Sequence, residues 1–356
     1  MFLRENTRKI SIGNLTIGGS DNITVQSMTN TDTRDAKTTI RQIRELEEAG
    51  CDIVRVAVPD MQAAENISKI VSEINIPLVA DIHFDYRLAV ASIKNGAHKI
   101  RINPGNMEKE EHIKAVVDCA KEYNVPIRVG VNSGSLPSSH PEKTADSVVS
   151  GARTQIDILE KYDFEDIVVS LKCSDINTSY LSYRLFAMQY NYPLHVGITE
   201  AGTVFSGTIK SCAGIGSILS LGIGNTIRVS LTGNPVEEIK VGRELLHSMN
   251  LGGNKKITFV SCPSCGRCKI DLVMTANEIE RRLNDPKFNN LIKKPITVAV
   301  MGCAVNGPGE ARHADIGLCG GDNEALLFEK GKIICKLHAS DMVDAFVKRV
   351  IEYATE

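Results

Sequence analysis

From the N-terminus to about Leu251, short apolar runs alternate with longer amphipathic segments. The apolar runs have the length of buried strands, and we predict strands at Thr24–Ser27, Ile53–Val58, Leu78–Ile82, Lys99–Asn103, Ile127–Val131, Ile167–Leu171, Leu194–Ile198 and Thr226–Leu231. The segments between them have helical spacing, which predicts helices such as Asp35–Ala49, Ala63–Ile74, Arg87–Asn95, Glu108–Tyr123, Asp146–Lys161 and Val236–Met249. Eight strand-plus-helix units predict a (β/α)₈ TIM barrel. An open doubly wound sheet is the competing architecture, but no Gly-x-Gly-x-x-Gly motif follows the first strand to favour it.

The pattern changes after Gly252-Gly253-Asn254. We predict strands at Ile257–Val260 and Thr297–Met301, a helix at Asp271–Leu283, a hairpin of Glu324–Glu329 with Lys332–Leu337, and a last helix at Asp341–Tyr353 capped by Ser340. The sequence therefore predicts two domains, a barrel in residues 1–252 and a small α/β domain in residues 253–356.

The composition is that of an ordinary globular protein, with 42% hydrophobic residues and a formal net charge of −2 over 356 residues. General nucleic-acid binding needs a surplus of lysine and arginine, so we expect no nucleic-acid partner. The N-terminus carries charges where a signal peptide needs its apolar core, and no apolar run is long enough to span a membrane. Most of the cysteines are scattered singly, which fits buried thiols in a reducing compartment. We therefore expect a cytoplasmic protein with no membrane partner.

Polar side chains gather at the C-terminal ends of the predicted strands, where TIM-barrel enzymes place their chemistry. In chain order these ends carry Arg55, Asp81, His83, Arg101, Asn103, Arg128, Asn132, Ser170, Lys172, Thr199, Glu200, Arg228 and Ser230. Residues two apart on a strand share a face, so the arginines and Lys172 are expected to ring one mouth. A lone arginine in a strand is most often a salt-bridged structural group. Cations that converge in a partly dry mouth, however, repel one another unless an anion neutralises them. The sequence therefore predicts a phosphate or diphosphate ligand.

A helix start after the seventh strand supports the same ligand. Ser206-Gly207-Thr208-Ile209-Lys210 is expected to open a helix, whose free N–H groups and nearby lysine suit a phosphate oxygen. The acid–base candidates are Asp81, His83 and Glu200, and Glu200 is our choice of proton donor. His83 can equally be a satisfied core histidine, and we interpret His195, inside the seventh strand, as structural.

Four cysteines are close together in the predicted small domain. Three lie in Cys262-Pro263-Ser264-Cys265-Gly266-Arg267-Cys268, and the fourth begins Cys303-Ala304-Val305-Asn306-Gly307-Pro308-Gly309-Glu310. A structural zinc site would use all four thiolates, whereas a redox dithiol needs one Cys-x-x-Cys pair. A cubane iron–sulfur cluster would use three thiolates and leave its fourth iron weakly held. Spacing alone does not separate zinc from iron–sulfur, but a neighbouring phosphate-binding barrel favours a cluster that reacts with substrate.

These motifs closely resemble those of the 4-hydroxy-3-methylbut-2-enyl diphosphate synthase family of the non-mevalonate isoprenoid pathway, in its two-domain bacterial form. The resemblance extends over essentially the whole chain. Besides the cysteine motifs, it is carried by Val25-Gln26-Ser27-Met28-Thr29-Asn30-Thr31, Ala80-Asp81-Ile82-His83-Phe84, Lys99-Ile100-Arg101-Ile102-Asn103-Pro104-Gly105, Arg128-Val129-Gly130-Val131-Asn132-Ser133-Gly134-Ser135-Leu136 and Thr226-Ile227-Arg228-Val229-Ser230-Leu231.

The resemblance implies reductive ring opening and dehydroxylation of 2-C-methyl-D-erythritol 2,4-cyclodiphosphate to the linear allylic diphosphate. It implies a [4Fe-4S] cluster held by Cys262, Cys265, Cys303 and Glu310, with Cys268 a nearby non-ligand. Flavodoxin or ferredoxin would deliver two electrons singly. The candidate substrate-binding residues are Arg55, Arg101, Asn103, Arg128, Asn132, Lys172, Lys210, Arg228, Ser230 and Asn306. The family also implies a homodimer in which the cluster domain of one subunit closes over the barrel mouth of the other.

Two alternatives stay open. A pterin-binding or methyl-transferring iron–sulfur enzyme on a similar barrel needs carboxylate and amide partners for the pterin ring more than several arginines. A zinc-stabilised binding or regulatory protein would use the four cysteines as a closed structural site.

Overall fold

The computed structural model describes residues 2–107, 109–132, 144–253, 256–285, 288, 291–303 and 313–355, apart from the side chain of Asn132. The chain divides into two compact units, Met1–Gly252 and Gly253–Glu356. In the ranges just given, no helix combines the length and the apolar character that crossing a membrane requires.

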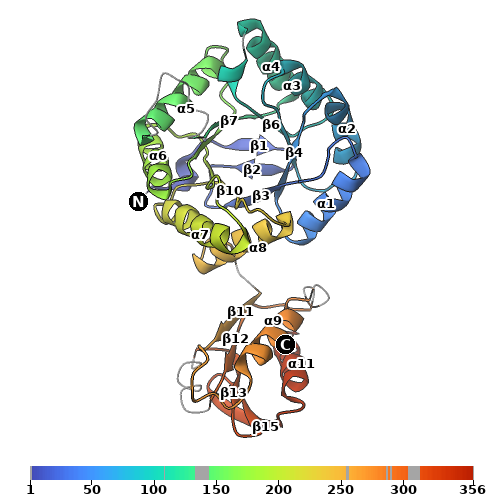
Figure 1. Cartoon of the computed structure of the whole chain (residues 1–356), viewed down its shortest axis with the longest axis vertical. Coiled ribbons are helices and arrows are strands. Elements are labelled where there is room, and N and C mark those ends of the chain that lie inside the picture. Colours follow the sequence, from blue (N-terminus) through green and yellow to red (C-terminus); the bar gives the residue numbers. More distant parts are fainter. Residues whose placement is uncertain are drawn as a thin grey trace. The chain divides into compact units, whose positions relative to one another are not determined.

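The larger unit is a ring of parallel strands surrounded by helices (Figure 1). The strands of the ring are β3 (Thr24–Met28), β4 (Ile53–Ala57), β5 (Leu78–Asp81), β6 (Lys99–Ile102), β7 (Ile127–Asn132), β8 (Ile167–Lys172), β9 (His195–Val196) and β10 (Thr226–Ile227). They are hydrogen-bonded in the order β8-β7-β6-β5-β4-β3-β10-β9, and a parallel bridge between Val169 and Leu194 joins the two ends. The predicted TIM barrel is confirmed.

The helices around the ring are α1 (Ala36–Glu48), α2 (Met61–Val71), α3 (Tyr86–Lys94), α4 (Glu110–Tyr123), α5 (Ala145–Glu160), α6 (Ile176–Gln189), α7 (Val204–Ser220) and α8 (Pro235–Ser248). Several begin at a polar residue whose side chain accepts a hydrogen bond from the first turn. Asp35 accepts from the Thr38 N–H, Asp60 from that of Ala63, and Asp175 from that of Thr178. These caps fix where the chain leaves each strand end, and so they hold the loops at the C-terminal mouth of the barrel.

A short hairpin closes the opposite, N-terminal end of the barrel, and the sequence patterns did not predict it. Strands β1 (Ile10–Ile12) and β2 (Leu15–Ile17) pair across a turn that contains Gly13 (φ 56°). Their three isoleucines are almost fully buried and pack on Ile53, Val79 and Val168, which lie low in the ring strands. The hairpin lies within the ring in Figure 1. The lumen is therefore closed by apolar side chains on this side.

The smaller unit is a mixed sheet with two helices packed on it. Its strands are β11 (Ile257–Ser261), β12 (Ile296–Met301), β13 (Ile316–Gly320), β14 (Glu324–Glu329) and β15 (Lys332–His338), paired in that order. The first three are parallel and the last three antiparallel. Helices α9 (Leu272–Leu283) and α11 (Met342–Thr355) share a core with the sheet, where Ile279, Val298 and Phe346 are fully buried.

Three details differ from the sequence predictions. The strand β13 was missed, and β9 and β10 are shorter than expected. After β10 the Arg228 N–H still donates to the Val196 carbonyl oxygen (2.9 Å), whereas the Leu231 N–H donates to the Glu238 carboxylate (3.0 Å). Ser340 does not cap the last helix, since its hydroxyl contacts His338 and the Asp341 side chain instead. The predicted hairpin of β14 and β15 is confirmed.

Candidate active site

The register of the ring strands stacks the inward-facing side chains in layers. Alternate residues such as Val54, Val56, Ile100 and Ile102 face the surrounding helices, so their neighbours face the lumen. In a tilted barrel, alternate strands contribute to the same level. From the N-terminal end upward, the pairings give a lowest layer of Ile53, Lys99, Val168 and Thr226, followed by Gln26, Val79, Arg128 and His195. Above these lie Arg55, Arg101, Ser170 and Arg228, then Met28, Asp81, Gly130 and Gly197, and last Asn103, Lys172 and Ser230. The lumen of this barrel is thus largely polar.

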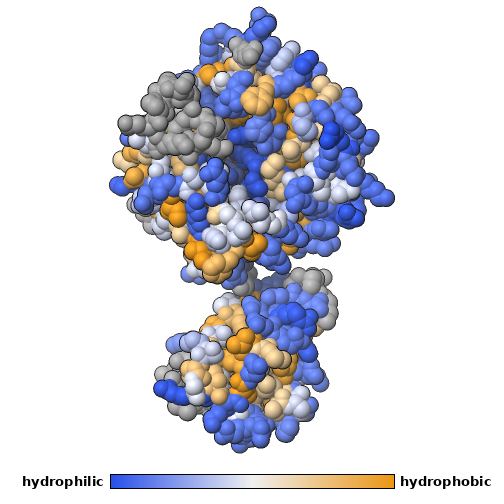
Figure 2. All heavy atoms as spheres, viewed as in Figure 1, coloured by the Kyte–Doolittle hydropathy of each residue, from blue (hydrophilic) through white to orange (hydrophobic). Residues whose placement is uncertain are grey.

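The predicted cations do converge on one mouth. They are Arg55 from β4, Arg101 from β6, Arg128 from β7, Lys172 from β8 and Arg228, which directly follows β10, and most of their surface is buried. Figure 2 shows hydrophilic atoms in the hollow at the centre of the ring. Converging buried cations cost free energy unless anions compensate them, so the arrangement suits a multiply charged anionic ligand.

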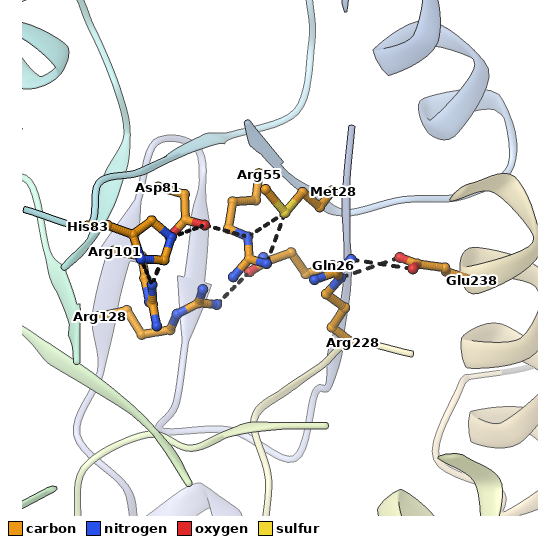
Figure 3. Close-up of polar contacts among 9 residues, drawn as sticks. All are labelled: Gln26, Met28, Arg55, Asp81, His83, Arg101, Arg128, Arg228 and Glu238. Atoms are coloured by element: carbon orange, nitrogen blue, oxygen red, sulfur yellow. Dashed lines mark hydrogen bonds and ion pairs between the residues drawn. The ribbon is translucent and has the colours of Figure 1, made fainter. Parts of the chain in front are cut away.

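Asp81 is the carboxylate around which two of these arginines are arranged (Figure 3). Its oxygens lie 3.8 Å from Arg55 Nε and 3.4 Å from Arg101 Nη1, and His83 Nε2 is 3.6 Å away. Burial alone would raise the pKa of Asp81, but Arg55, His83 and Arg101 together hold it well below its usual range. Asp81 is therefore ionised at neutral pH, and His83, which is half exposed, lies at the edge of this cluster.

Several donors of the cluster point at weak acceptors. Arg55 donates from Nε and Nη2 to the Met28 sulfur, at 3.1 and 2.9 Å. Arg128 donates from Nη1 to the amide oxygen of Gln26 (3.3 Å), while its Nε has no hydrogen-bond partner in the described part of the chain. Burial lowers the pKa of Arg55 to about 10 and that of Arg128 well below its ordinary value. A thioether and an amide are poor substitutes for a phosphate oxygen, which both guanidinium groups could accommodate.

Arg228 is held by a carboxylate at the outer edge of the ring. Its Nε and Nη2 lie 3.3 Å from the two oxygens of Glu238 on α8, which also accepts from the Ser27 hydroxyl (2.8 Å). Figure 3 shows this pair beside the lumen cluster. Glu238 was not among the predicted residues, and no motif signals it, because it is a helical residue that reaches back to the strand end.

Two glycines make room for the charged side chains, and sequence reasoning missed both. A Cβ on Gly130 would lie 2.9 Å from the Ser170 hydroxyl and 3.4 Å from Arg101 Nε. A Cβ on Gly197 would lie 2.6 Å from the Arg228 carbonyl oxygen and 3.0 Å from Lys172 Nζ. The signal that could have found them is a glycine at a lumen-facing strand position, which often marks the close approach of another group.

The remaining predicted barrel residues occupy varied positions. Helix α7 begins at Val204, two residues earlier than expected, so Ser206 lies within its first turn. Lys210 Nζ donates to the backbone oxygen of Glu200 (3.2 Å). The Glu200 side chain is exposed, and its backbone has φ 52°, a conformation that is strained for a glutamate. Asn103 is buried, and its side-chain oxygen accepts from the Gly105 N–H (3.1 Å) to cap the short helix Pro104–Asn106.

Two further predicted residues, Asn132 and Ser230, also lie near the strand ends. Asn132 pairs in register with Lys172, but its side chain is outside the described atoms. Ser230 follows β10, two residues after Arg228, and is half-buried.

In the small unit, two adjacent parallel strands deliver two of the cysteines. Cys262 directly follows β11 and Cys303 follows β12 by two residues, and the strand ends are paired in register. The Gly302 N–H donates to Cys262 Sγ (3.3 Å). The two strands thus bring a pair of soft donors to one sheet edge, which fits an iron–sulfur or zinc centre.

Cys268 and Cys319 also lie near this edge. Cys268 Sγ accepts from the Cys265 N–H (3.4 Å) and packs against Gly302, where a side chain would collide with it. Cys319 is fully buried in β13 and packs near Cys262. Burial, with smaller contributions from Cys303 and Cys262, raises the pKa of Cys319 to about 12. Cys319 is therefore a thiol, and the sequence did not place it beside the motif.

The structure describes only some of the predicted cluster ligands. No group of three or more His, Cys, Asp or Glu side chains is arranged to hold a metal ion among the residues that the structure describes. Asn306 and Glu310 belong to residues 304–312, which are outside the described ranges.

The barrel is similar to solved structures of other enzymes. A type I 3-dehydroquinate dehydratase from Clostridium difficile aligns with a TM-score of 0.53 and 15% identity, over 68% of this chain and 98% of that one. A dihydropteroate synthase from Xanthomonas albilineans aligns with a TM-score of 0.50 and 13% identity, over 69% and 99%. At such low identity these likenesses establish the fold alone.

Comparison of the sequence with known proteins identifies the family of the chain as well as its fold. A 4-hydroxy-3-methylbut-2-en-1-yl diphosphate synthase (flavodoxin) from Clostridium perfringens is 56% identical over 97% of this chain and 98% of its own length. One of the same name from Caldanaerobacter subterraneus subsp. tengcongensis is 54% identical over 99% of both. The GcpE TIM-barrel domain model matches residues 7–243, and the GcpE protein C-terminal domain model matches residues 258–352. The chain therefore belongs to the GcpE family, the family of the 4-hydroxy-3-methylbut-2-en-1-yl diphosphate synthases.

Proposed function

We propose that this enzyme converts 2-C-methyl-D-erythritol 2,4-cyclodiphosphate into 4-hydroxy-3-methylbut-2-enyl diphosphate, with flavodoxin as electron donor. The relatives named for this product and for flavodoxin match nearly the whole chain, and the family is one of iron–sulfur enzymes. The reaction takes up two electrons and one proton. It opens the cyclic diphosphate by breaking one C–O bond of the ring, and it releases one hydroxyl group as water. The observation in the structure that carries the proposal is the cluster of buried cations, in which donors of Arg55 and Arg128 face weak acceptors or none among the described residues.

The diphosphate is proposed to bind among Arg55, Arg128 and Lys172. Arg55 would exchange the Met28 sulfur for a phosphate oxygen, and Arg128 would use its unpartnered Nε. Lys172 is buried over Gly197, where burial and the neighbouring Arg228 and Arg128 lower its pKa well below the ordinary value. As the ring opens, the diphosphate gains negative charge. A preorganised cationic lumen stabilises that developing charge more than it stabilises the cyclic substrate.

We propose that Asp81 positions the arginines and does not transfer a proton. Its low pKa makes it a permanent anion, and its two oxygens fix Arg55 and Arg101 before substrate arrives. Arg101 and Arg228 would then contribute from guanidinium groups that carboxylates already orient. Asn103, Asn132 and Ser230 stay proposed as polar contacts around the substrate, and Lys210 as a cation at the start of α7.

Glu200 stays our proposed proton donor. Its exposed side chain and left-handed backbone lie in the loop that follows β9, at the end of the barrel where the cations gather. A strained, non-glycine residue at such a position is an indication of function. His83, beside Asp81, is the second candidate for proton transfer to the departing hydroxyl.

The cofactor is proposed to be a [4Fe-4S] cluster held by Cys262, Cys265, Cys303 and Glu310. When bound, such a cluster supplies electrons singly and an iron that can act as a Lewis acid. Cys268 is proposed as a non-ligand that supports Gly302, and Asn306 as a residue that positions substrate or holds the cluster loop. We also propose a cytoplasmic homodimer in which the cluster domain of one subunit completes the barrel site of the other.

Anaerobic preparation and assay test the proposal. Protein purified without oxygen should contain iron and sulfide and should convert the cyclodiphosphate to the linear diphosphate with reduced flavodoxin. A colourless, zinc-loaded protein would support the structural-zinc alternative. Iron–sulfur protein that binds a pterin tightly and ignores the cyclodiphosphate would support the pterin or methyl-transfer alternative.

A further inference from the structure

Lys99 is a buried lysine that the proposed reaction does not use. It lies at the start of β6, two residues before Arg101, and therefore faces the lumen. Its side chain is fully buried, and its Nζ has no hydrogen-bond partner within the described residues. An isolated ammonium ion in such a place is very costly, so the site must either remove its proton or supply an anion.

The groups around Lys99 make the ammonium form still less favourable. The lumen holds the basic side chains of Arg55 from β4, Arg101 from β6, Arg128 from β7, Lys172 from β8 and Arg228 after β10. His195 from β9 also faces it, but burial and the neighbouring basic groups lower its pKa well below the ordinary value, so it supplies no positive charge. The carboxylates of Asp81 and Glu238 face the same group of side chains, and both are already engaged by arginines. Burial first, and then Arg128 and Arg55, lower the pKa of Lys99 well below its ordinary value. The apolar hairpin below offers no anion, since Ile53, Val79 and Val168 cover that side.

We propose that Lys99 is an uncharged amine in the free enzyme and becomes an ammonium ion when an anionic diphosphate binds among the arginines above it. This inference rests on the diphosphate site of the proposed function but requires only that an anion binds among the arginines. Lys99 would then be a counter-charge for the bound ligand, held out of contact with it by the layer of Arg55 and Arg101.

The distances make this coupling substantial. Strand residues rise by about 3.3 Å each, so a phosphate held by Arg101 and Arg128 would lie on the order of 10 Å from Lys99 Nζ. At an effective protein dielectric of about 20, each negative charge at that distance favours the ammonium form by roughly ten-fold. The sign follows from linkage. The pKa of Lys99 is depressed in the free enzyme and is raised when the anion binds, so binding takes up protons. Affinity for the anion therefore strengthens as pH falls from the pKa of Lys99 in the bound enzyme to its pKa in the free enzyme.

Titration calorimetry in buffers of different ionisation enthalpy measures this proton uptake directly. The anaerobically prepared holoprotein would be titrated with inorganic diphosphate and, separately, with the cyclodiphosphate, in Hepes and in Tris over a range of pH. We expect the wild type to take up measurably more protons than Lys99→Met, by up to one per site. The wild-type Kd should also weaken with pH more steeply than that of the variant. Lys94→Met, the same change at an exposed lysine of α3, should leave the uptake at the wild-type value.

Equal proton uptake by the wild type and Lys99→Met overturns the inference. If methionine is not tolerated at this position, Lys99→Gln serves the same purpose, and a folded glutamine variant with wild-type uptake overturns it equally. Lys99-dependent uptake with diphosphate alone, without binding of the cyclodiphosphate, would support the inference and contradict the proposed substrate. Failure of both anions to bind would contradict both proposals.

Discussion

The side-chain nitrogen of Lys172, Nζ, lies over Gly197, 3.0 Å from the point that a Cβ on that residue would occupy. Lys172 ends β8 and Gly197 directly follows β9, and the bridge between Val169 and Leu194 joins these two strands. The missing side chain at Gly197 is what allows a buried lysine to extend into the lumen at this level. The charge of the proposed diphosphate site therefore depends on a residue that has no side chain.

Gly197→Ala should weaken substrate binding. Its Cβ would lie 2.6 Å from the Arg228 carbonyl oxygen, which cannot move freely, and it would push Lys172 aside. We expect KM for the cyclodiphosphate to rise by about ten-fold or more and stability to fall by about 1–3 kcal/mol. Gly216→Ala, in the middle of α7, is the matched control, because its Cβ would make only an ordinary contact with Leu245. Unchanged KM in Gly197→Ala would mean that Lys172 does not contact the substrate.

Asp81→Asn should lower kcat/KM by about a hundred-fold, because Arg55 and Arg101 lose the anion that positions them. The pKa of Asp81 is lower in the folded enzyme than in the unfolded chain, where a carboxyl group has a pKa of about 4. The ionised carboxylate therefore stabilises the fold fully at pH values above about 4, and this stabilisation is lost as the pH falls below that value. Urea unfolding should show a constant difference between wild type and variant from pH 5 to 9. An acid limb of activity near pH 6 that vanishes in Asp81→Asn would instead identify Asp81 as a proton-transfer group.

The sequence predicted the barrel and the residues of its mouth because both follow from local rules. Strand–helix alternation identifies the fold, and alternation along a strand places Arg101 and Asn103 on one face. The missing parts depend on long-range contacts. Glu238 reaches Arg228 from a later helix, and Gly130 and Gly197 matter only through what packs over them. The strands of the N-terminal hairpin are three residues each, too short for a periodic signal.

The cysteines of the motif should differ in their importance for iron. Cys268→Ser should retain the iron and the visible spectrum of the wild type, because Cys268 packs on Gly302 and accepts the Cys265 N–H. Cys265→Ser should lose most of its iron, as measured by iron and sulfide content after anaerobic purification. Comparable iron loss in both variants would assign a ligand role to Cys268.

Glu310→Gln tests the proposed oxygen ligand. Substrate affinity should stay within about two-fold of the wild type, because the arginines of the barrel are unchanged. Turnover should fall by at least ten-fold, or the cluster should be lost more quickly on dilution, since an amide oxygen is a weaker ligand than a carboxylate. Full activity with a stable cluster would exclude Glu310 as a ligand.

Ile12→Ala should destabilise the barrel by about 2–5 kcal/mol, because Ile12 is fully buried between the hairpin and the ring. Ile209→Ala, at a residue of α7 that is 56% exposed, is the matched control and should change stability by no more than about 0.5 kcal/mol. Urea unfolding followed by circular dichroism measures both. Equal effects would mean that the hairpin contributes little to the stability of the barrel.

Because of the same N-terminal hairpin, the lumen of the barrel is closed at one end and open at the other. Because Ile10, Ile12 and Ile17 close one end, the proposed substrate, its product and the water that they displace must all exchange through the mouth at the other end. A second substrate molecule then cannot enter until the first product has left. Entry and release share one opening, so the release of product has to precede the binding of substrate in every turnover.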